Sequence, residues 1–484
     1  MYNKNDNNNQ TQKVDNNMRT KESEKQVKIT KLAITDDKMS GRGGLFFFLK
    51  YVENIGFYRL FEDKFGFLRT SKKGLRIQEF IKQVLAHFID GSDMSMTAFD
   101  RRKSDSGYAA LLEYDKERLA SSHQMKRFFA KFLVVGNLLF RKILAELFIV
   151  RLRIEKPKVI VLFGDTMVLD NDDADKRQGV EPTYKKKKGF QPLHLSWGTY
   201  LIDVVFRKGS THSNHGNDFL RAVTRITVLI RKRYCVDIPI ILLTDSGFLD
   251  DKNLRYFEEK LKIFYVCVGK QYTELKEYVQ ACDASAFKEF SSKKQLWHFI
   301  EFGNRLKSWA TLRRCIFTSL AADETGQLNL DFAKIDLFIY TNLGQDKTMT
   351  EQLIKAGGKA YLQPEKIIEL NHQRGRCELV HRSIKELATK EQLPFEKFSM
   401  NRAYYYLLVL AHFLFEIYKR DVAYDVIATT VYPNTFRRRL IDFAAKVVAT
   451  GGKVYLKVTH TLHDGLNLSK LWTRCMQPEP ILLL

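Results

Sequence analysis

The sequence predicts an α/β protein in which a mixed-sheet core is interrupted by a β-rich insertion and joined to a helical N-terminal domain and a basic C-terminal region. Three observations lead to this class. Apolar residues repeat at helical spacing up to about residue 150, runs rich in β-branched residues begin at residue 157, and strands and helices alternate from there. A chain of 484 residues is also too long for one ordinary core, so we expect two to four domains.

The changes in pattern divide the chain into six segments. They are, in order, a disordered polar tail, a helical domain, the first part of the core, the β-rich insertion, the helical second part of the core, and a basic region: residues 1–30, 31–150, 151–270, 271–345, 346–425 and 426–484. The tail is rich in Asn, Lys and Gln and has too few apolar residues to form a core of its own.

The elements of the core follow from local patterns. "KVIVLFGDTMVL" is a buried strand, and "QPLHLSWGTYLIDVVFRKGS" gives two more strands that turn near Gly198. A helix over 216–234, the strand "DIPIILLTDSGF", a helix at about 250–260 and the strand "KIFYVCV" come next. Three strands followed by alternating helices and strands predict a mixed sheet, antiparallel first and parallel afterwards.

The remaining segments are assigned in the same way. In the N-terminal domain, apolar residues at helical spacing predict a helix: Ile77, Phe80, Ile81, Val84, Leu85 and Phe88. The insertion shows alternating segments joined by a turn at Gly326. The apolar run "AYYYLLVLAHFLF" at 403–415 is too short to span a bilayer, so we expect a buried helix there and no membrane association.

Composition indicates the partner and the compartment. The chain has 79 Lys and Arg against 56 Asp and Glu, a net charge of +23. Such an excess favours a polyanionic partner, most often nucleic acid, although it also fits simple solubility. The six cysteines form no C-x-x-C pair, which argues against a structural zinc site or a disulfide framework and indicates the cytoplasm.

Three carboxylates stand out because of their context. Asp165 lies in or just after the first core strand, and Asp245 follows "IPIILLT" at the carboxyl end of another, where sites in α/β sheets gather. A buried unpaired charge is costly, and binding Mg²⁺ offsets that cost because hard cations take carboxylate oxygens. Two metal ions can then activate a nucleophile and stabilise a leaving oxygen in phosphoryl transfer. We expect both residues to converge with Glu378 within metal-bridging reach.

Glu378 belongs to a stretch crowded with cations, "QRGRCELVHRSIKE". On a helical projection, five polar residues fall on one arc of about 100°: Arg374, Glu378, His381, Arg382 and Lys385. An apolar arc lies beside it: Cys377, Val380, Ile384 and Leu387. The helix is therefore expected to anchor by one face and present Glu378 on the next. The alternative is an ordinary ion-paired surface, where each pair contributes only about 0.3–0.5 kcal/mol.

Taken together, three stretches resemble a bacterial insertion-sequence transposase of the DDE type with an RNase H-like catalytic core. They are "FGDTMVLDNDDADKRQGVEPTYKKKKGFQPLHL", "LLTDSGF" and "NHQRGRCELVHRSIKEL", and the resemblance covers roughly 31–470. The last stretch resembles the YREK pattern, Y-x-x-R-x-x-x-E-x-x-x-x-x-x-K, at Arg374, Glu378 and Lys385. Asn371 stands where the family has tyrosine, and a β-rich insertion also fits this branch.

The resemblance implies an activity and its parts. Asp165, Asp245 and Glu378 become catalytic residues and ligands of Mg²⁺, with Mn²⁺ as a substitute, while Arg374 and Lys385 become phosphate contacts. The partner is double-stranded DNA, both terminal inverted repeats and target, bound by a homodimer in the synaptic complex. The helical N-terminal domain and basic C-terminal region are candidates for repeat recognition and synapsis. The location is the bacterial cytoplasm, at the nucleoid when bound.

Weaker signals complete the candidate DNA contacts. Arg382 shares the polar arc. The loop "YKKKKG" supplies four cations that can clamp the backbone or stay solvated: Lys185, Lys186, Lys187 and Lys188. Trp297 is a candidate for stacking on a flipped base, with core packing as the alternative. Two other functions stay open, a metal-dependent nuclease without strand transfer and a non-catalytic domesticated transposase.

Overall fold

The computed structural model describes most of the chain, in six ranges: 29–69, 73–133, 135–292, 294–322, 336–388 and 391–478. The chain divides into two units, residues 1–37 and residues 38–484. Of the first unit, residues 29–37 are described, and they are exposed and form neither helix nor strand. Residues 1–28 of the predicted tail and the predicted turn at Gly326 lie outside the described residues.

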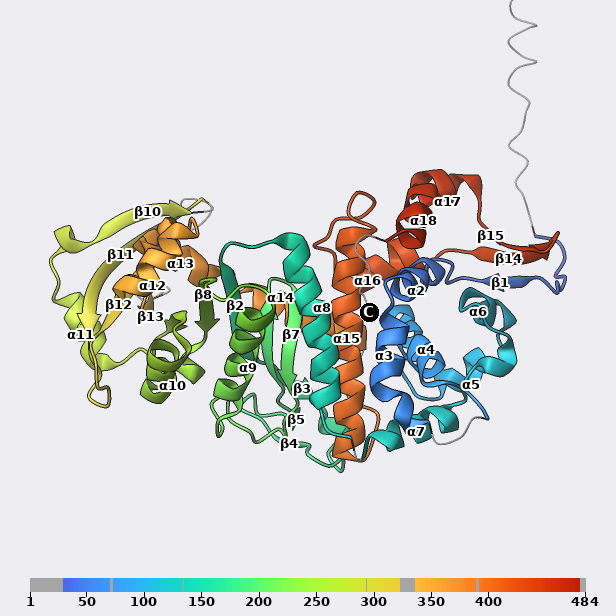
Figure 1. Cartoon of the computed structure of the whole chain (residues 1–484), viewed down its shortest axis with the longest axis horizontal. Coiled ribbons are helices and arrows are strands. Elements are labelled where there is room, and N and C mark those ends of the chain that lie inside the picture. The colour runs from blue at the N-terminus through green and yellow to red at the C-terminus, as the bar shows by residue number, and fades with distance from the viewer. Residues whose placement is uncertain are drawn as a thin grey trace, which may run out of the picture. The chain divides into compact units, whose positions relative to one another are not determined.

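A nine-stranded mixed sheet forms the core of the second unit (Figure 1). Its strands are β2 (Ile160–Thr166), β6 (Leu193–Trp197), β7 (Tyr200–Val205), β8 (Ile240–Thr244), β9 (Phe264–Val268), β10 (Lys288–Ser292), β11 (Gln295–Asn304), β12 (Arg313–Ala322) and β13 (Asp336–Thr341). Their spatial order is β10-β11-β12-β13-β9-β8-β2-β6-β7. Every residue of β8 and β9 is buried, which explains why both read as unbroken apolar runs.

The pairing within the core matches the predicted order. Strand β2 pairs antiparallel with β6, and β6 pairs antiparallel with β7. Gly198 turns the chain between β6 and β7 with a φ of 59°, a conformation that glycine adopts without strain. Strand β2 then pairs parallel with β8, and β8 with β9. The crossovers run through α9 (Asp218–Arg233) and through α10 (Asp251–Arg255) with the π-helical turn η6 (Tyr256–Leu261).

The segment predicted as a β-rich insertion continues this sheet. It carries α11 (Thr273–Gln280) and strands β10 to β13, and β13 pairs antiparallel with β9. The backbone groups on the free side of β9 thereby gain hydrogen-bonding partners. Sequence patterns predicted strands here but not that they extend the core sheet.

Helices make up most of the rest of the molecule. Among the described residues, seven lie in the predicted N-terminal domain or begin there, and α8 runs past its predicted end: α2 (Leu45–Asn54), α3 (Phe57–Phe65), α4 (Ile77–Asp90), α5 (Ala98–Lys103), α6 (Ser106–Leu111), α7 (Ser122–Ala130) and α8 (Leu138–Glu155). Four follow the sheet: α12 (Lys347–Lys355), α13 (Pro364–Gln373), α14 (Arg376–Ala388) and α15 (Phe398–Asp421). In the described part of the chain, no helix combines the length and the apolar character needed to cross a membrane.

Helix α15 is the buried helix that the apolar run predicted. All its residues from Ala403 to Lys419 are buried, and it packs against α2, α4, α7, α8, α14 and β7. Helices α2 to α8 therefore share one apolar core with α15. The predicted boundaries between the six segments stay predictions.

Two small sheets were not predicted. One joins β3 (Leu169–Asp170), β5 (Lys188–Phe190) and β4 (Glu181–Pro182). The other joins β1 (Lys38–Ser40), β14 (Ala445–Thr450) and β15 (Lys453–Lys457), so that the first strand pairs with the C-terminal region. Four helical segments flank the second sheet: α16 (Pro433–Phe436), η10 (Arg437–Ile441), α17 (His460–Gly465) and α18 (Leu468–Met476).

Candidate active site

The parallel pair β2 and β8 brings two of the predicted carboxylates together. The register aligns Gly164 with Thr244, so Asp165 and Asp245 are the next residues along neighbouring strands. Each carboxylate accepts one nearby backbone N–H, Asp165 Oδ1 from Thr166 at 2.7 Å and Asp245 Oδ1 from Gly247 at 3.0 Å. These contacts fix the orientation of both side chains and leave the second oxygen of each for a ligand.

The two carboxylates are electrostatically coupled. Burial and the negative charge of Asp245 raise the pKa of Asp165 from 3.8 to about 6, and the charge of Glu378 adds to the rise. Burial also raises the pKa of Asp245. Such shifts arise when like charges share a poorly solvated site, and a cation bound between them removes the cause.

Arg374 reaches this site from a turn between two helices. It is the C-cap of α13, and α14 begins two residues later at Arg376. The prediction that Arg374 continues the same helical arc as Glu378 is therefore wrong, because Gly375 lies in a break that periodicity does not reveal. The positive charge of Arg374 lowers the pKa of both Asp165 and Asp245. Among the described residues, no carboxylate lies within ion-pairing distance of its guanidinium.

Helix α14 anchors by the apolar arc predicted for it. Cys377, Val380, Ile384 and Leu387 are all buried, and Glu378 is exposed on the next face. Glu378 is close enough for its charge to raise the pKa of Asp165. Among the described residues, no three Asp, Glu, His or Cys side chains gather closely enough to hold a metal ion, so the convergence of Glu378 with both aspartates stays a prediction. Mutual repulsion of three carboxylates opposes such gathering without a cation.

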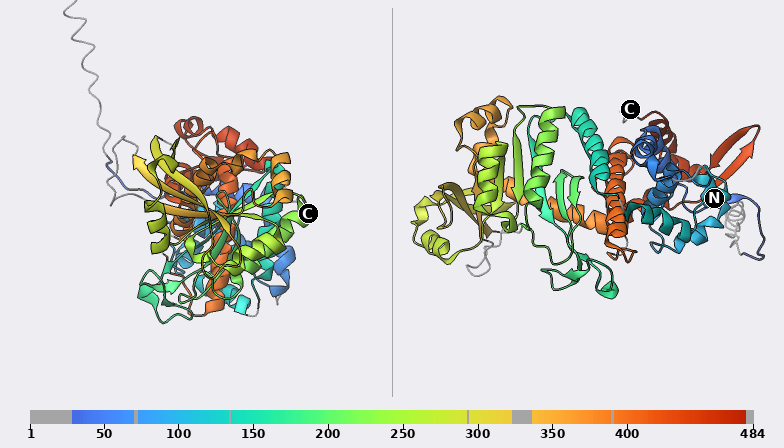
Figure 2. Two further views of the ribbon diagram at one scale, coloured as in Figure 1. Left: turned by 90° about the vertical axis from the view of Figure 1, so that its left-hand side faces the viewer. Right: turned by 60° about the horizontal axis from the view of Figure 1, so that its bottom comes forward.

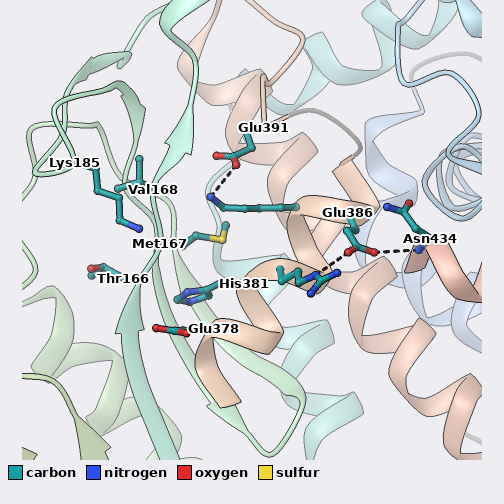
Figure 3. Close-up of a pocket in the computed structure, with 11 residues that line it drawn as sticks. Thr166, Met167, Val168, Lys185, Glu378, His381, Glu386, Glu391 and Asn434 are labelled. Atoms are coloured by element: carbon teal, nitrogen blue, oxygen red, sulfur yellow. Dashed lines mark hydrogen bonds and ion pairs between the residues drawn. The ribbon is translucent and has the colours of Figure 1, made fainter. Parts of the chain in front are cut away.

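A cavity of about 480 Å³ lies beside Glu378. Glu378 and His381 line it from α14, and Lys185 lines it from the turn before β5 (Figure 3). Burial and the charges of Lys385 and Lys185 lower the pKa of His381 to about 4, so its imidazole is neutral at pH 7. The ring of His381 packs on that of His194, with centroids 5.1 Å apart.

The other cations of α14 are engaged by carboxylates of the same chain. Lys385 pairs with Glu391 at 2.8 Å, and Arg382 pairs with Glu386 at 3.0 Å (Figure 3). The Arg382 guanidinium also lies over the Tyr432 ring, 4.1 Å from its centroid. A phosphate has to compete with these partners for either side chain.

The "YKKKKG" loop divides into two pairs of lysines. Lys187 pairs with Asp170 and Asp172, at 3.5 and 3.1 Å, and Lys188 pairs with Asp175 at 2.9 Å. These exposed pairs favour the alternative of a solvated charged loop for that half. Lys185 faces the cavity, and Lys186 occupies the left-handed position of the turn with a φ of 57°.

Trp297 has the environment of a core residue. It lies on β11, is 5% exposed, and packs its ring on His372 with centroids 4.3 Å apart. Stacking on a base would require the ring to leave this position. This environment favours core packing, the role that residue statistics already favour for such a tryptophan, over stacking on a base.

The donor set at the strand ends fits a hard divalent cation. It consists of carboxylate oxygens, which Mg²⁺ and Mn²⁺ prefer. Burial and the charge of Asp245 raise the pKa of Asp165, and a bound cation would offset both effects. Asp165 and Asp245 are the residues that would hold it, and Glu378, whose charge raises the pKa of Asp165, would complete the set.

Sequence reasoning missed three residues around the cavity. His381 was placed on the polar arc without a role. Glu386 lies four residues after Arg382, a spacing that signals an ion pair, and it was overlooked. Glu391 follows α14 beyond the end of its periodic pattern, so no local signal identified it as the partner of Lys385.

Comparison with known proteins assigns the family. A solved structure, "Cryo-EM structure of piggyBac transposase synaptic complex with hairpin DNA", shows similarity at 12% sequence identity with a TM-score of 0.39, covering 91% of this chain and 83% of that chain. No curated protein matches the sequence. The profile of the family described as transposase DDE domain group 1 matches residues 21–477. Because this match spans nearly the whole sequence, the chain belongs to the transposase DDE domain group 1 family.

Proposed function

We propose that this transposase cuts the ends of an insertion sequence and joins them to target DNA by two-metal-ion phosphoryl transfer. The observation that carries the proposal is the placement of Asp165 and Asp245 at adjacent ends of parallel strands, where burial and the charge of Asp245 raise the pKa of Asp165. A carboxylate pair at that edge of a sheet is suited to hold metal ions against a phosphodiester. The strand order β7-β6-β2-β8-β9 supports an RNase H-like core.

Each residue of the site has a distinct task in this proposal. When bound, Mg²⁺ or Mn²⁺ supplies activation of the attacking oxygen and stabilisation of the leaving oxygen. Asp165 and Asp245 would hold the ions, and Glu378 would complete the set. Arg374 is placed to donate two parallel hydrogen bonds to a phosphate, a geometry that lysine cannot reproduce. The neutral His381 can donate or accept one hydrogen bond inside the cavity.

The chemistry has two stages. Water attacks the phosphodiester at the element's end and frees a 3′-OH, and that hydroxyl then attacks the target strand at the same site. Arg374, Glu378 and Lys385 support assignment to the bacterial YREK branch, with Asn371 in place of its tyrosine. The net charge of +23 supports double-stranded DNA as the partner. A homodimer in the synaptic complex and a cytoplasmic, nucleoid-associated location complete the proposal.

One experiment separates this function from its rivals. Purified protein is incubated with Mg²⁺ and a labelled duplex carrying the source element's end, alongside the Asp245→Asn variant. A 3′-OH end and a joined product, both lost in the variant, are expected. Cleavage without joining would identify a nuclease, and specific binding without cleavage would identify a non-catalytic DNA-binding protein.

A further inference from the structure

The C-terminal hairpin β14–β15 is a ribbon with one basic face. Opposite residues on antiparallel strands share a face, and the register pairs Val448 with Tyr455 and Thr450 with Lys453. Lys457 follows on the same face of β15 by alternation. This face carries Lys446, Val448 and Thr450 from β14 and Lys453, Tyr455 and Lys457 from β15, and is called the lysine face.

The opposite face of the ribbon is the one that anchors it. Val447 and Leu456 are directly paired, and both pack against the apolar core. Helix α6 packs against β1 and β14. Since the face that carries Val447 and Leu456 packs against the core, the lysine face turns outward.

The far end of the hairpin extends beyond its support. Gly451 and Gly452 form the turn with φ of 56° and 71°, the left-handed pair that a tight two-residue hairpin turn requires. Val454 is 71% exposed although it shares the anchoring face. The ribbon projects from the neighbouring helices (Figure 2, right). A projecting two-stranded ribbon has the width that the major groove of B-DNA admits.

Two charges of the lysine face, those of Lys453 and Lys457, lie at the exposed part of the ribbon. In the part of the chain that the structure describes, no carboxylate lies within ion-pairing distance of Lys453 or Lys457. No Asp or Glu occurs from Phe443 to His463. In contrast, Arg382, Lys385, Lys187 and Lys188 near the candidate active site are all paired.

We propose that the lysine face binds the phosphate backbone of duplex DNA away from the catalytic carboxylates. The proposal rests on the proposed function and names one surface through which the partner is held. Exposed lysines free of carboxylate partners bind phosphates by releasing condensed counterions, which is favourable and salt-dependent. Lysine residues on exposed strands also oppose pairing of those strands with other chains. The same residues therefore disfavour a second copy of this chain as the partner that binds the lysine face.

Binding of a fluorescein-labelled duplex of arbitrary sequence tests the proposal. Anisotropy is measured between about 50 and 200 mM salt, where log Kd changes linearly with log salt by about 0.9 per phosphate contact. Lys453→Gln with Lys457→Gln should weaken binding and lower this slope by about 2. The arginine versions of both substitutions should keep the slope. Lys38→Gln is the matched control, since Lys38 opposes Val447 on the anchoring face of the same sheet.

The outcomes are distinguishable. If the wild type binds the duplex and the double glutamine variant shows an unchanged slope, the proposed DNA-binding role of the lysine face is overturned and the proposed function is not affected. A wild-type protein that binds no duplex at all would overturn both. If the double variant alters the sedimentation of the DNA-free protein instead, the face contacts a second copy and the proposal fails. Circular dichroism of the variants checks that the fold is retained.

Discussion

Removing one negative charge from the candidate active site should stabilise the metal-free protein. The perturbation is Asp165→Asn, which keeps the side chain's volume and its acceptor for the Thr166 N–H. In the folded protein the pKa of Asp165 is about 6 against an ordinary value of 3.8. A raised carboxylate pKa means that the folded state holds this proton more tightly than the unfolded state. Stability therefore falls as pH rises from about 4 to 6, and the full cost is present above pH 6.

The magnitude follows from the size of the shift. A difference of about two units between the folded and the ordinary pKa lowers the free energy of unfolding by about 3 kcal/mol at pH 8 and by about half of that at pH 5. Because Asp165 is largely buried, solvent screening takes little from this figure. The variant should thus unfold at higher urea concentration than the wild type at pH 8 in EDTA, with the gain shrinking at pH 5.

Urea unfolding followed by tryptophan fluorescence measures both points. Adding Mg²⁺ should stabilise the wild type more than the variant, since binding to the folded state raises stability. Asp203→Asn is the control. Asp203 accepts hydrogen bonds from Arg141 at 3.0 Å and Arg225 at 2.6 Å, and its loss should cost about 3 kcal/mol. The reasoning would be refuted if the variant at position 165 were less stable than the wild type at pH 8, or if its gain in stability were the same at pH 5 and pH 8.

Three further predictions concern other parts of the molecule. Glu378→Gln should abolish both cleavage of intact ends and joining of pre-nicked ends, whereas Arg374→Lys should keep some joining on the pre-nicked end. Gel assays of both substrates measure these activities. Full activity of the glutamine variant would favour the alternative interpretation of this helix as an ordinary ion-paired surface. Glu391→Gln frees Lys385 from its pair and should tighten duplex binding by about two- to five-fold, given about 0.4–1 kcal/mol for a half-exposed pair; weaker binding by anisotropy would contradict this. Arg313→Met leaves two carboxylates without their buried partner and should lower the free energy of unfolding by about 3 kcal/mol, which is seen as a lower melting temperature. An unchanged melting temperature would show that these two ion pairs contribute nothing to stability.

The sequence predicted the core sheet because its strands carry strong local signals. The continuous apolar runs of β8 and β9 are typical of strands buried on both faces, and Asp245 stood out as the acidic residue directly after the β8 run. Asp165 lies inside β2 and stood out less sharply. The apolar arc of α14 was equally clear. In all these cases burial dictates the residue type, on both faces of β8 and β9 and on one face of α14.

What the sequence left open depends on contacts between distant segments. The break at Gly375 escaped because apolar spacing continues across it. The pairing of Lys385 with Glu391 arises after α14 ends, and that of β1 with β14 spans most of the chain. Trp297 carried no sign of its burial, since an aromatic residue on a strand faces either side with equal ease.

The shared core of α15 has a consequence for how the protein is made. Phe48 of α2 packs edge-on against Tyr418, and Phe88 of α4 packs against Tyr404. A ribosome releases these early helices long before α15 exists to cover them, and exposed apolar faces of that kind attract chaperones or aggregate. A message cut short before codon 398 would yield a chain with no cover for either helix. The cell therefore acquires a finished transposase only once α15 has been translated and can cover these helices.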